Sequence, residues 1–75
     1  MVFQLMHRNG ATRKLTFEKV DVDSFAELLQ AAECRALIDN FRICTILSEP
    51  GEYLADVMQT REGRMMVYGF PPVAR

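Results

Sequence analysis

The chain has 75 residues, of which 49% are hydrophobic and 25% are charged, a composition that predicts one small folded domain and excludes a disordered chain. Its formal net charge is only -1, and neither the basic first twenty residues nor the acidic middle has the charge density of a nucleic-acid or membrane patch. No segment approaches the roughly 20 apolar residues of a membrane span and no signal peptide is recognisable, so a cytoplasmic protein is expected.

The first twenty residues predict a β-hairpin. Residues 1–7 alternate loosely, with Phe3 and Leu5 on one side, and residues 12–18 alternate more clearly. Asn9-Gly10 stands between them. This dipeptide is typical of a two-residue type I′ turn, because both central positions of that turn need a positive φ.

A helix is predicted to begin at Ser24. The Ser24 hydroxyl can accept a hydrogen bond from the backbone of Glu27, whose carboxylate can reach back to Ser24, and this pair forms a capping box. An apolar stripe with helical spacing follows, and it is expected to face a sheet: Phe25, Leu28, Leu29, Ala32 and Ala36.

Three apolar residues, Cys34, Leu37 and Ile38, fall outside that stripe on a continuous helix. Either the helix bends or stops near residues 33–35, or these side chains form an exposed apolar patch. We expect the break, since exposed apolar patches are uncommon. Asp39-Asn40 would end the segment.

The remaining chain predicts a three-strand meander with strands at residues 41–48, 53–59 and 64–70, separated by turns at 49–52 and 60–63. Pro71-Pro72 ends the last strand, because proline lacks the N–H that a ladder requires. The predicted fold is therefore α+β with the order β-β-α-β-β-β: a single helix on one face of a four- or five-stranded, mainly antiparallel sheet. Residues 1–70 form the domain, and residues 71–75 form a short proline-containing tail.

Two strands of the meander carry apolar side chains on both faces. Residues 41–48 place Cys44 and Ile46 opposite Ile43 and Leu47, and the last strand places Met65 and Val67 opposite its other apolar residues. An antiparallel sheet with one wet face should alternate apolar and polar residues. A single helix covers one face only, so a second apolar face is predicted.

This second face predicts a small non-catalytic module that binds protein, either a second copy of itself or a larger partner. The expected interaction residues are Ile46, Met66, Tyr68 and Phe70. The alternative is that the helix and the tail cover these side chains within one chain.

No catalytic, cofactor or metal site is predicted. The single histidine, His7, is expected at the surface near the first turn, and a pair with Cys34 or Cys44 would lack an orienting group. The two cysteines are ten residues apart, without the paired spacing of a zinc site. Both are expected to be free and buried thiols.

Binding of single-stranded nucleic acid is a further alternative. Tyr68 and Phe70 could stack bases on the sheet, with Arg13, Lys14 and Arg64 contacting phosphates. The sequence pI of about 5.7 argues against this interpretation.

The order of a hairpin, one helix and a three-strand meander is similar to that of some small phage-encoded anti-CRISPR proteins, with Gly51-Glu-Tyr-Leu-Ala55 and Glu62-Gly63-Arg64 as local echoes. The hairpin and capped helix alone also resemble the first half of ubiquitin-like β-grasp domains. The first resemblance implies an inhibitor that occupies a surface of a larger complex, and it assigns no functional residues.

Overall fold

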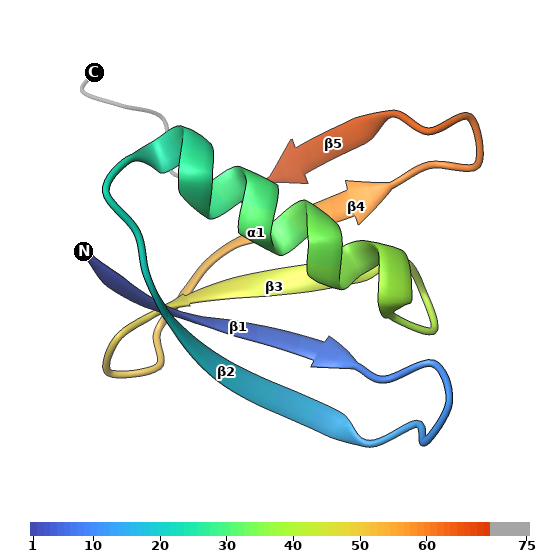
Figure 1. Cartoon of the computed structure of the whole chain (residues 1–75), viewed down its shortest axis with the longest axis horizontal. Coiled ribbons are helices and arrows are strands. Elements are labelled where there is room, and N and C mark those ends of the chain that lie inside the picture. Colours follow the sequence, from blue (N-terminus) through green and yellow to red (C-terminus); the bar gives the residue numbers. More distant parts are fainter. Residues whose placement is uncertain (70–75) are drawn as a thin grey trace.

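The computed structural model describes residues 1–69 and shows one helix against one sheet (Figure 1). The elements in chain order are β1 (Val2–Arg8), β2 (Leu15–Asp21), α1 (Phe25–Ile38), β3 (Ile43–Ser48), β4 (Tyr53–Gln59) and β5 (Met65–Tyr68). The strands form a five-stranded sheet in the order β2-β1-β3-β4-β5, and every neighbouring pair is antiparallel. The α+β class and the order of elements predicted from the sequence are confirmed.

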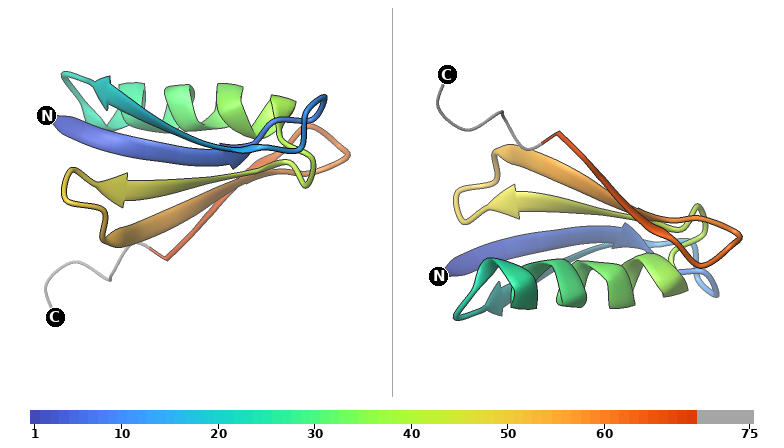
Figure 2. Two further views of the ribbon diagram at one scale, coloured as in Figure 1. Left: turned by 90° about the horizontal axis from the view of Figure 1, so that it is seen from below. Right: turned by 90° about the horizontal axis from the view of Figure 1, so that it is seen from above.

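The helix covers one face of the twisted sheet, and the opposite face carries no second layer from the described residues (Figure 2). Helix α1 packs against the three central strands, β1, β3 and β4. The two edge strands, β2 and β5, lie at or beyond the margin of this cover. The structure is therefore two layers deep over the middle of the sheet and one layer deep at its sides.

The core lies between α1 and the central strands. From the helix it contains Leu28, Ala32 and Ala36, all with no exposed surface. The rest of the buried cluster comes from the sheet and from the residue after β2: Leu5, Val22, Cys44, Ile46 and Val57. Full burial of a side chain such as Ile46 stabilises the fold by roughly 1.5–3 kcal/mol.

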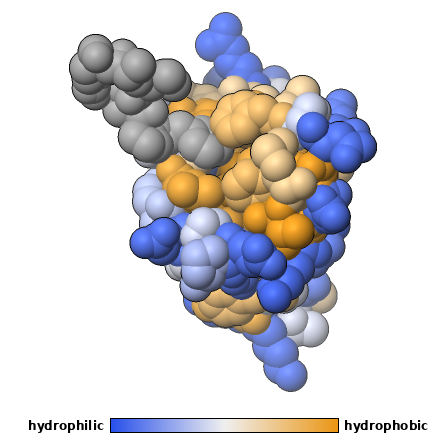
Figure 3. All heavy atoms as spheres, turned by 90° about the vertical axis from the view of Figure 1, so that its left-hand side faces the viewer, coloured by the Kyte–Doolittle hydropathy of each residue, from blue (hydrophilic) through white to orange (hydrophobic). Residues whose placement is uncertain are grey.

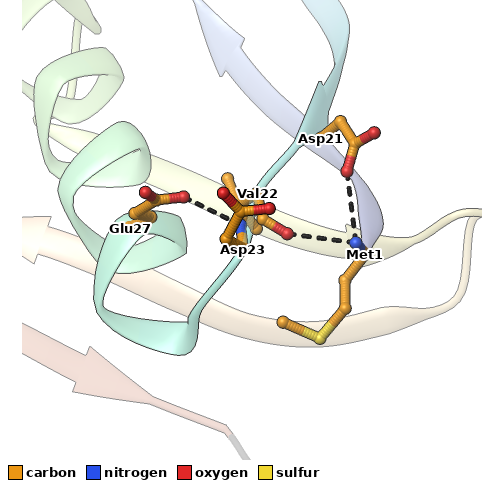
Figure 4. A network of polar contacts seen from close by, with 5 residues as sticks. All are labelled: Met1, Asp21, Val22, Asp23 and Glu27. Atoms are coloured by element: carbon orange, nitrogen blue, oxygen red, sulfur yellow. Dashed lines mark hydrogen bonds and ion pairs between the residues drawn. The ribbon is translucent and has the colours of Figure 1, made fainter.

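Helix α1 begins at the predicted N-cap. The Ser24 hydroxyl accepts a hydrogen bond from the Glu27 N–H at 3.2 Å. The Glu27 carboxylate, however, accepts from the N–H of Asp23 at 2.8 Å, one residue before the Ser24 group that the capping box predicts (Figure 4). Both contacts hold the chain entering the helix.

The segment between β2 and α1 is also tied to the start of β1 (Figure 4). The amino group of Met1 donates to the Val22 carbonyl at 3.0 Å and forms an ion pair with Asp21 at 3.1 Å. The Val22 N–H donates in return to the Met1 carbonyl at 2.9 Å. This reciprocal pair extends the β1–β2 ladder to the point where the chain turns towards the helix.

The predicted break in the helix is wrong. Helix α1 is continuous to Ile38, and Cys34, Leu37 and Ile38 are exposed on the side away from the sheet. The helix continues because two residues hold its last turn. Arg35 binds strand β2, and Asp39 caps the C-terminal end of the helix. The exposed apolar patch, the other alternative, is what the structure contains.

Asp39 joins three segments at the end of the helix. Its N–H donates to the Ala36 carbonyl, and its carboxylate accepts hydrogen bonds from the backbone N–H groups of Phe41 at 2.7 Å, of Ile43 at 3.1 Å and of Arg8. The side chain is only 9% exposed. A single carboxylate thereby fixes the end of α1 against the end of β1 and the start of β3.

The predicted two-residue turn at Asn9-Gly10 is also wrong, because six residues, 9–14, connect β1 to β2. The Asn9 side chain accepts from the N–H groups of Ala11 at 2.8 Å and Thr12 at 3.1 Å, and the residue with positive φ is Arg13, at 60°. Gly10 instead allows a close approach to the end of the helix. Its N–H donates to the Ile38 carbonyl, and a Cβ there would lie 3.1 Å from that oxygen.

Two polar contacts tie the helix to the sheet. Arg35 forms a two-pronged ion pair with Glu18 of β2, at 3.0 and 2.6 Å. The Arg35 guanidinium holds the pKa of Glu18 below its usual value. Near β4, the buried Gln59 amide donates to the Glu33 carboxylate at 3.0 Å. These contacts fix the rotation of α1 over the sheet.

Candidate protein-interaction surface

The sheet face turned away from α1, called the open face below, is built from cross-strand pairs that form three rows. The central row contains one residue from every strand: Phe17, Met6, Thr45, Asp56 and Tyr68. The end row lies towards the finish of β1 and β4 and contains Leu15, Arg8, Ile43, Met58 and Met66. The starting row contains Lys19, Gln4, Leu47 and Tyr53.

Large apolar or aromatic side chains dominate this face. Phe17 is 56% exposed, Tyr53 53%, Tyr68 47%, Leu15 45% and Met66 41%. Most of them lie on the outer strands, where no neighbouring strand shields one side. Contiguous exposed apolar surface of this kind is typical of interaction sites in folded proteins.

A polar group sits in the middle of the open face. The Asp56 carboxylate accepts hydrogen bonds from the Thr45 hydroxyl at 2.5 Å and from the Tyr53 hydroxyl at 3.0 Å. Partial desolvation and the nearby carboxylate raise the pKa of Tyr53, so its hydroxyl remains a donor. Among residues 1–69, no basic group forms an ion pair with Asp56.

Tyr53 is held in place by the backbone opposite. Gly69 has a φ of 104°, and a Cβ at this position would lie 2.4 Å from the Tyr53 hydroxyl oxygen. Only glycine can therefore adopt this backbone conformation against the ring. The close approach presents the Tyr53 hydroxyl to Asp56.

A shallow hollow of about 230 Å³ lies on the β1–β3 side of the end row. Its apolar lining residues are Met6, Leu15, Phe41 and Ile43, and its polar lining residues are His7, Arg8, Asp39 and Thr45. Phe41 is 71% exposed, the largest fraction among the large apolar side chains in the described part of the chain. The open face therefore combines a hollow on one half with two methionines on the other half, the exposed Met66 and the partly buried Met58.

The structure separates the residues predicted to form the interaction surface. Met66 and Tyr68 lie on the open face and are exposed, as proposed. Ile46 does not belong there, because it points to the opposite face and is fully buried beneath α1. Side chains alternate between the two faces along β3, so Ile46 points away from the face of its neighbour Thr45, which belongs to the central row of the open face. Phe70 lies outside the described residues.

Most of the open face was not predicted from the sequence. Leu15 and Phe17 of β2 lie in the same rows as Met66 and Tyr68 but do not belong to the surface predicted from the sequence. The alternation of β2 carries this signal. The alternation identifies Phe17 as an open-face residue only when the strand register is known. The pairs Met6↔Phe17 and Met6↔Thr45 place β2 and β3 on either side of β1.

The residues of the nucleic-acid alternative are not brought together. Arg13 and Lys14 lie in the connection after β1, and Arg64 lies in the connection after β4, at the same end of the sheet but near opposite edges. Tyr68 lies at the other end of β5. Within residues 1–69, no continuous basic path runs beside the exposed Tyr68.

The histidine and the cysteines occupy two different environments. His7 is 5% exposed, so the expected surface position is wrong, and its Nδ1 atom has no hydrogen-bond partner among the described residues. Burial raises the pKa of Cys44 to about 12, which keeps this thiol neutral and weakly nucleophilic. Cys34 is exposed rather than buried, and both thiols are free. Residues 1–69 contain no cluster of three or more His, Cys, Asp or Glu side chains that could hold a metal ion.

Apolar surface also reaches the end of the molecule where β1 and α1 begin, as Figure 3 shows. Charged residues border this patch. Met1 and Phe25, which stand at the starts of the chain and of the helix, are 60% and 50% exposed. Exposed apolar surface is therefore not confined to the open face.

Within residues 1–69, no helix has the length and apolar character needed to cross a membrane. Comparisons with protein-family models, with curated proteins and with solved structures gave no match to this chain.

Proposed function

We propose that this protein is a small non-catalytic module that binds protein through the open face of its sheet. The observation that carries the proposal is the mismatch between one helix and two apolar sheet faces. Helix α1 covers the face that contains Ile46 and Val57, and the face that contains Phe17 and Tyr68 remains exposed. Exposed aromatic side chains of this kind dominate the energy of protein interfaces.

The composition of the face supports a protein partner. Tyrosine and methionine are enriched in interfaces, tyrosine because it joins an apolar ring to a hydroxyl group and methionine because its side chain adapts in shape. The polar centre formed by Thr45, Tyr53 and Asp56 would give the contact a preferred orientation. A purely apolar face would bind with less selectivity.

A retention assay tests this proposal. The wild type, Phe17→Lys and Tyr68→Lys are each immobilised and exposed to a cell extract and, separately, to a solution of the untagged chain. The proteins that each one retains are then compared. The matched control is Ile38→Lys, because Ile38 is 53% exposed but lies on α1, away from the open face. We expect the wild type and the control to retain the same protein, and the two open-face variants to lose it. The retained protein is then titrated in purified form.

The proposal fails if folded wild type retains no protein, itself included, or if the open-face variants retain the same protein as the control. Titration of labelled single-stranded RNA at two salt concentrations tests the nucleic-acid alternative, which requires binding at low salt that weakens as salt rises. Far-UV circular dichroism establishes that each variant is folded.

A further inference from the structure

We infer that the occupant of the open face is a second copy of this chain, docked face to face about a two-fold axis that runs along β3. This inference rests on the proposed function and names its partner. It follows from three properties of the two halves of the face, the β1–β2 half and the β4–β5 half: their shape, their charge and their aromatic residues.

The symmetry exchanges the two halves and keeps each row at its level. Strand β3 is the central strand of the sheet, with two strands on either side. A rotation about its direction places β1 over β4 and β2 over β5 of the second copy. The strands of the two sheets then run nearly in line, as in aligned sandwiches, where the sheets cross at about -30°.

The first property is the complementary shape of the two halves. The hollow lined by Met6, Leu15 and Ile43 lies on the β1–β3 side of the end row, and Met58 and Met66 lie on the β4–β5 side of the same row. The rotation places these methionines of one copy over the hollow of the other, and the symmetry repeats the contact. Two flexible methionine side chains are well suited to fill a shallow apolar hollow.

The second property is the opposite charge of one residue on each half. Asp56 lies on β4 without a basic partner in the described part of the chain, and Arg8 lies on β1 in the neighbouring row. The Arg8 guanidinium is exposed and donates to the Arg13 carbonyl at 2.9 Å. After the rotation, β1 faces β4 of the second copy, so that Arg8 comes within one row of the Asp56 carboxylate. Opposite charges meet twice in the pair.

The third property is the position of one aromatic residue on each half. Phe17 and Tyr68 occupy the two ends of the central row, and each is about half exposed, at 56% and 47%. The rotation places Phe17 of one copy over Tyr68 of the other. Pairing two β5 strands edge to edge would instead leave Phe17 and Leu15 uncovered.

The available area is of the required order. Five strands at a spacing of about 4.8 Å and a strand length of about 20 Å give a flat face of roughly 480 Å². The relief of the side chains raises the accessible area towards the roughly 800 Å² that each partner buries in a stable interface. The whole open face is needed, which favours stacking of the complete sheets over a contact at one edge.

Sedimentation equilibrium across a concentration series tests the pair, with wild type, Phe17→Lys, Arg8→Glu and the control Ile38→Lys. We expect wild type and the control to form dimers with the same dissociation constant, Phe17→Lys to remain monomeric, and Arg8→Glu to raise the constant about tenfold. Far-UV circular dichroism monitors folding, and Arg8→Glu keeps the test valid if Phe17→Lys does not fold.

Crosslinking tests the orientation. In a Cys34→Ser background, a Phe17→Cys copy is mixed with a Tyr68→Cys copy and treated with a short bismaleimide. We expect the mixed crosslink to form much faster than either homotypic crosslink, because the rotation places position 17 over position 68.

Three results would overturn the inference: a monomer at all concentrations, an unchanged dimer in Phe17→Lys, or preferential homotypic crosslinks. A monomer that retains a foreign protein through the open face would remove the second copy as occupant and leave the proposed function intact. A monomer that retains no protein would remove both.

Discussion

The carboxylate of Asp39 offers a sharp test of how this fold is held together. It accepts hydrogen bonds from three backbone N–H groups, those of Arg8, Phe41 and Ile43, in a site that is 9% exposed. Asp39→Ala leaves these donors without their acceptor. Hydrogen bonds to a charged group contribute roughly 1.5–3 kcal/mol each, and partial access of water to the three donors reduces the total.

We expect Asp39→Ala to lower the free energy of unfolding by about 3 kcal/mol, out of roughly 4–11 kcal/mol for a chain of this length. Asp39→Asn keeps one acceptor oxygen and should lose about half as much. The Phe41 and Ile43 donors share Oδ2, whereas the Arg8 donor binds Oδ1, so either orientation of the amide leaves part of the set unpaired.

Urea denaturation followed by far-UV circular dichroism measures both changes. With a slope of about 1 kcal/mol per molar urea, typical of small domains, 3 kcal/mol corresponds to a midpoint shift of about 3 M. The control is Asp21→Ala, because the Asp21 side chain is 77% exposed and pairs only with the Met1 amino group in the described structure. A loss below about 1 kcal/mol for Asp39→Ala would refute the role assigned to this carboxylate.

Three further predictions concern the helix and the buried thiol. Ser24→Ala should lower the free energy of unfolding by about 1 kcal/mol in urea denaturation, and an unchanged midpoint would contradict the cap. Glu18 has a lowered pKa, so its pairing with Arg35 stabilises the fold above the unfolded pKa and is lost as pH falls through the folded value. Denaturation of Glu18→Gln as a function of pH should therefore show a loss of at most about 1 kcal/mol at pH 7 that disappears in acid, and a loss independent of pH would argue against the pair. Because burial raises the pKa of Cys44 to about 12, a thiol reagent at pH 8 should modify Cys34 rapidly and Cys44 only on unfolding, and two fast equivalents by mass spectrometry would disprove this.

The elements were predictable because their local signals agree with their packing. Ser24 starts the helix where predicted, and the strand predicted at 53–59 is β4, Tyr53–Gln59. Leu28, Ala32 and Ala36 are the buried stripe of α1. The predictions were wrong where side-chain hydrogen bonds determine the path of the backbone. The Asn9 side chain closes its own turn, and the Asp39 side chain holds the end of the helix beyond the predicted break.

The interaction surface was less predictable, because alternation divides a strand into two faces without saying which face the helix covers. On β3 both faces are apolar, and Ile46 was assigned to the wrong one. The packing selects the Cys44 and Ile46 face because small residues of the helix, Ala32 and Ala36, approach it closely. Only the register across β1 then identifies Phe17 as a neighbour of the predicted face.

The position of β5 has a consequence for how the molecule moves. All four of its residues are exposed, so the strand is held mainly by its ladder to β4, with little hydrophobic contribution. Amide protons of β5 should therefore exchange with deuterium through local opening, while those of β3 wait for global unfolding. If a second sheet closes over Met66 and Tyr68, ordering of this outermost strand and association become one cooperative event, and slowed exchange at β5 would report assembly.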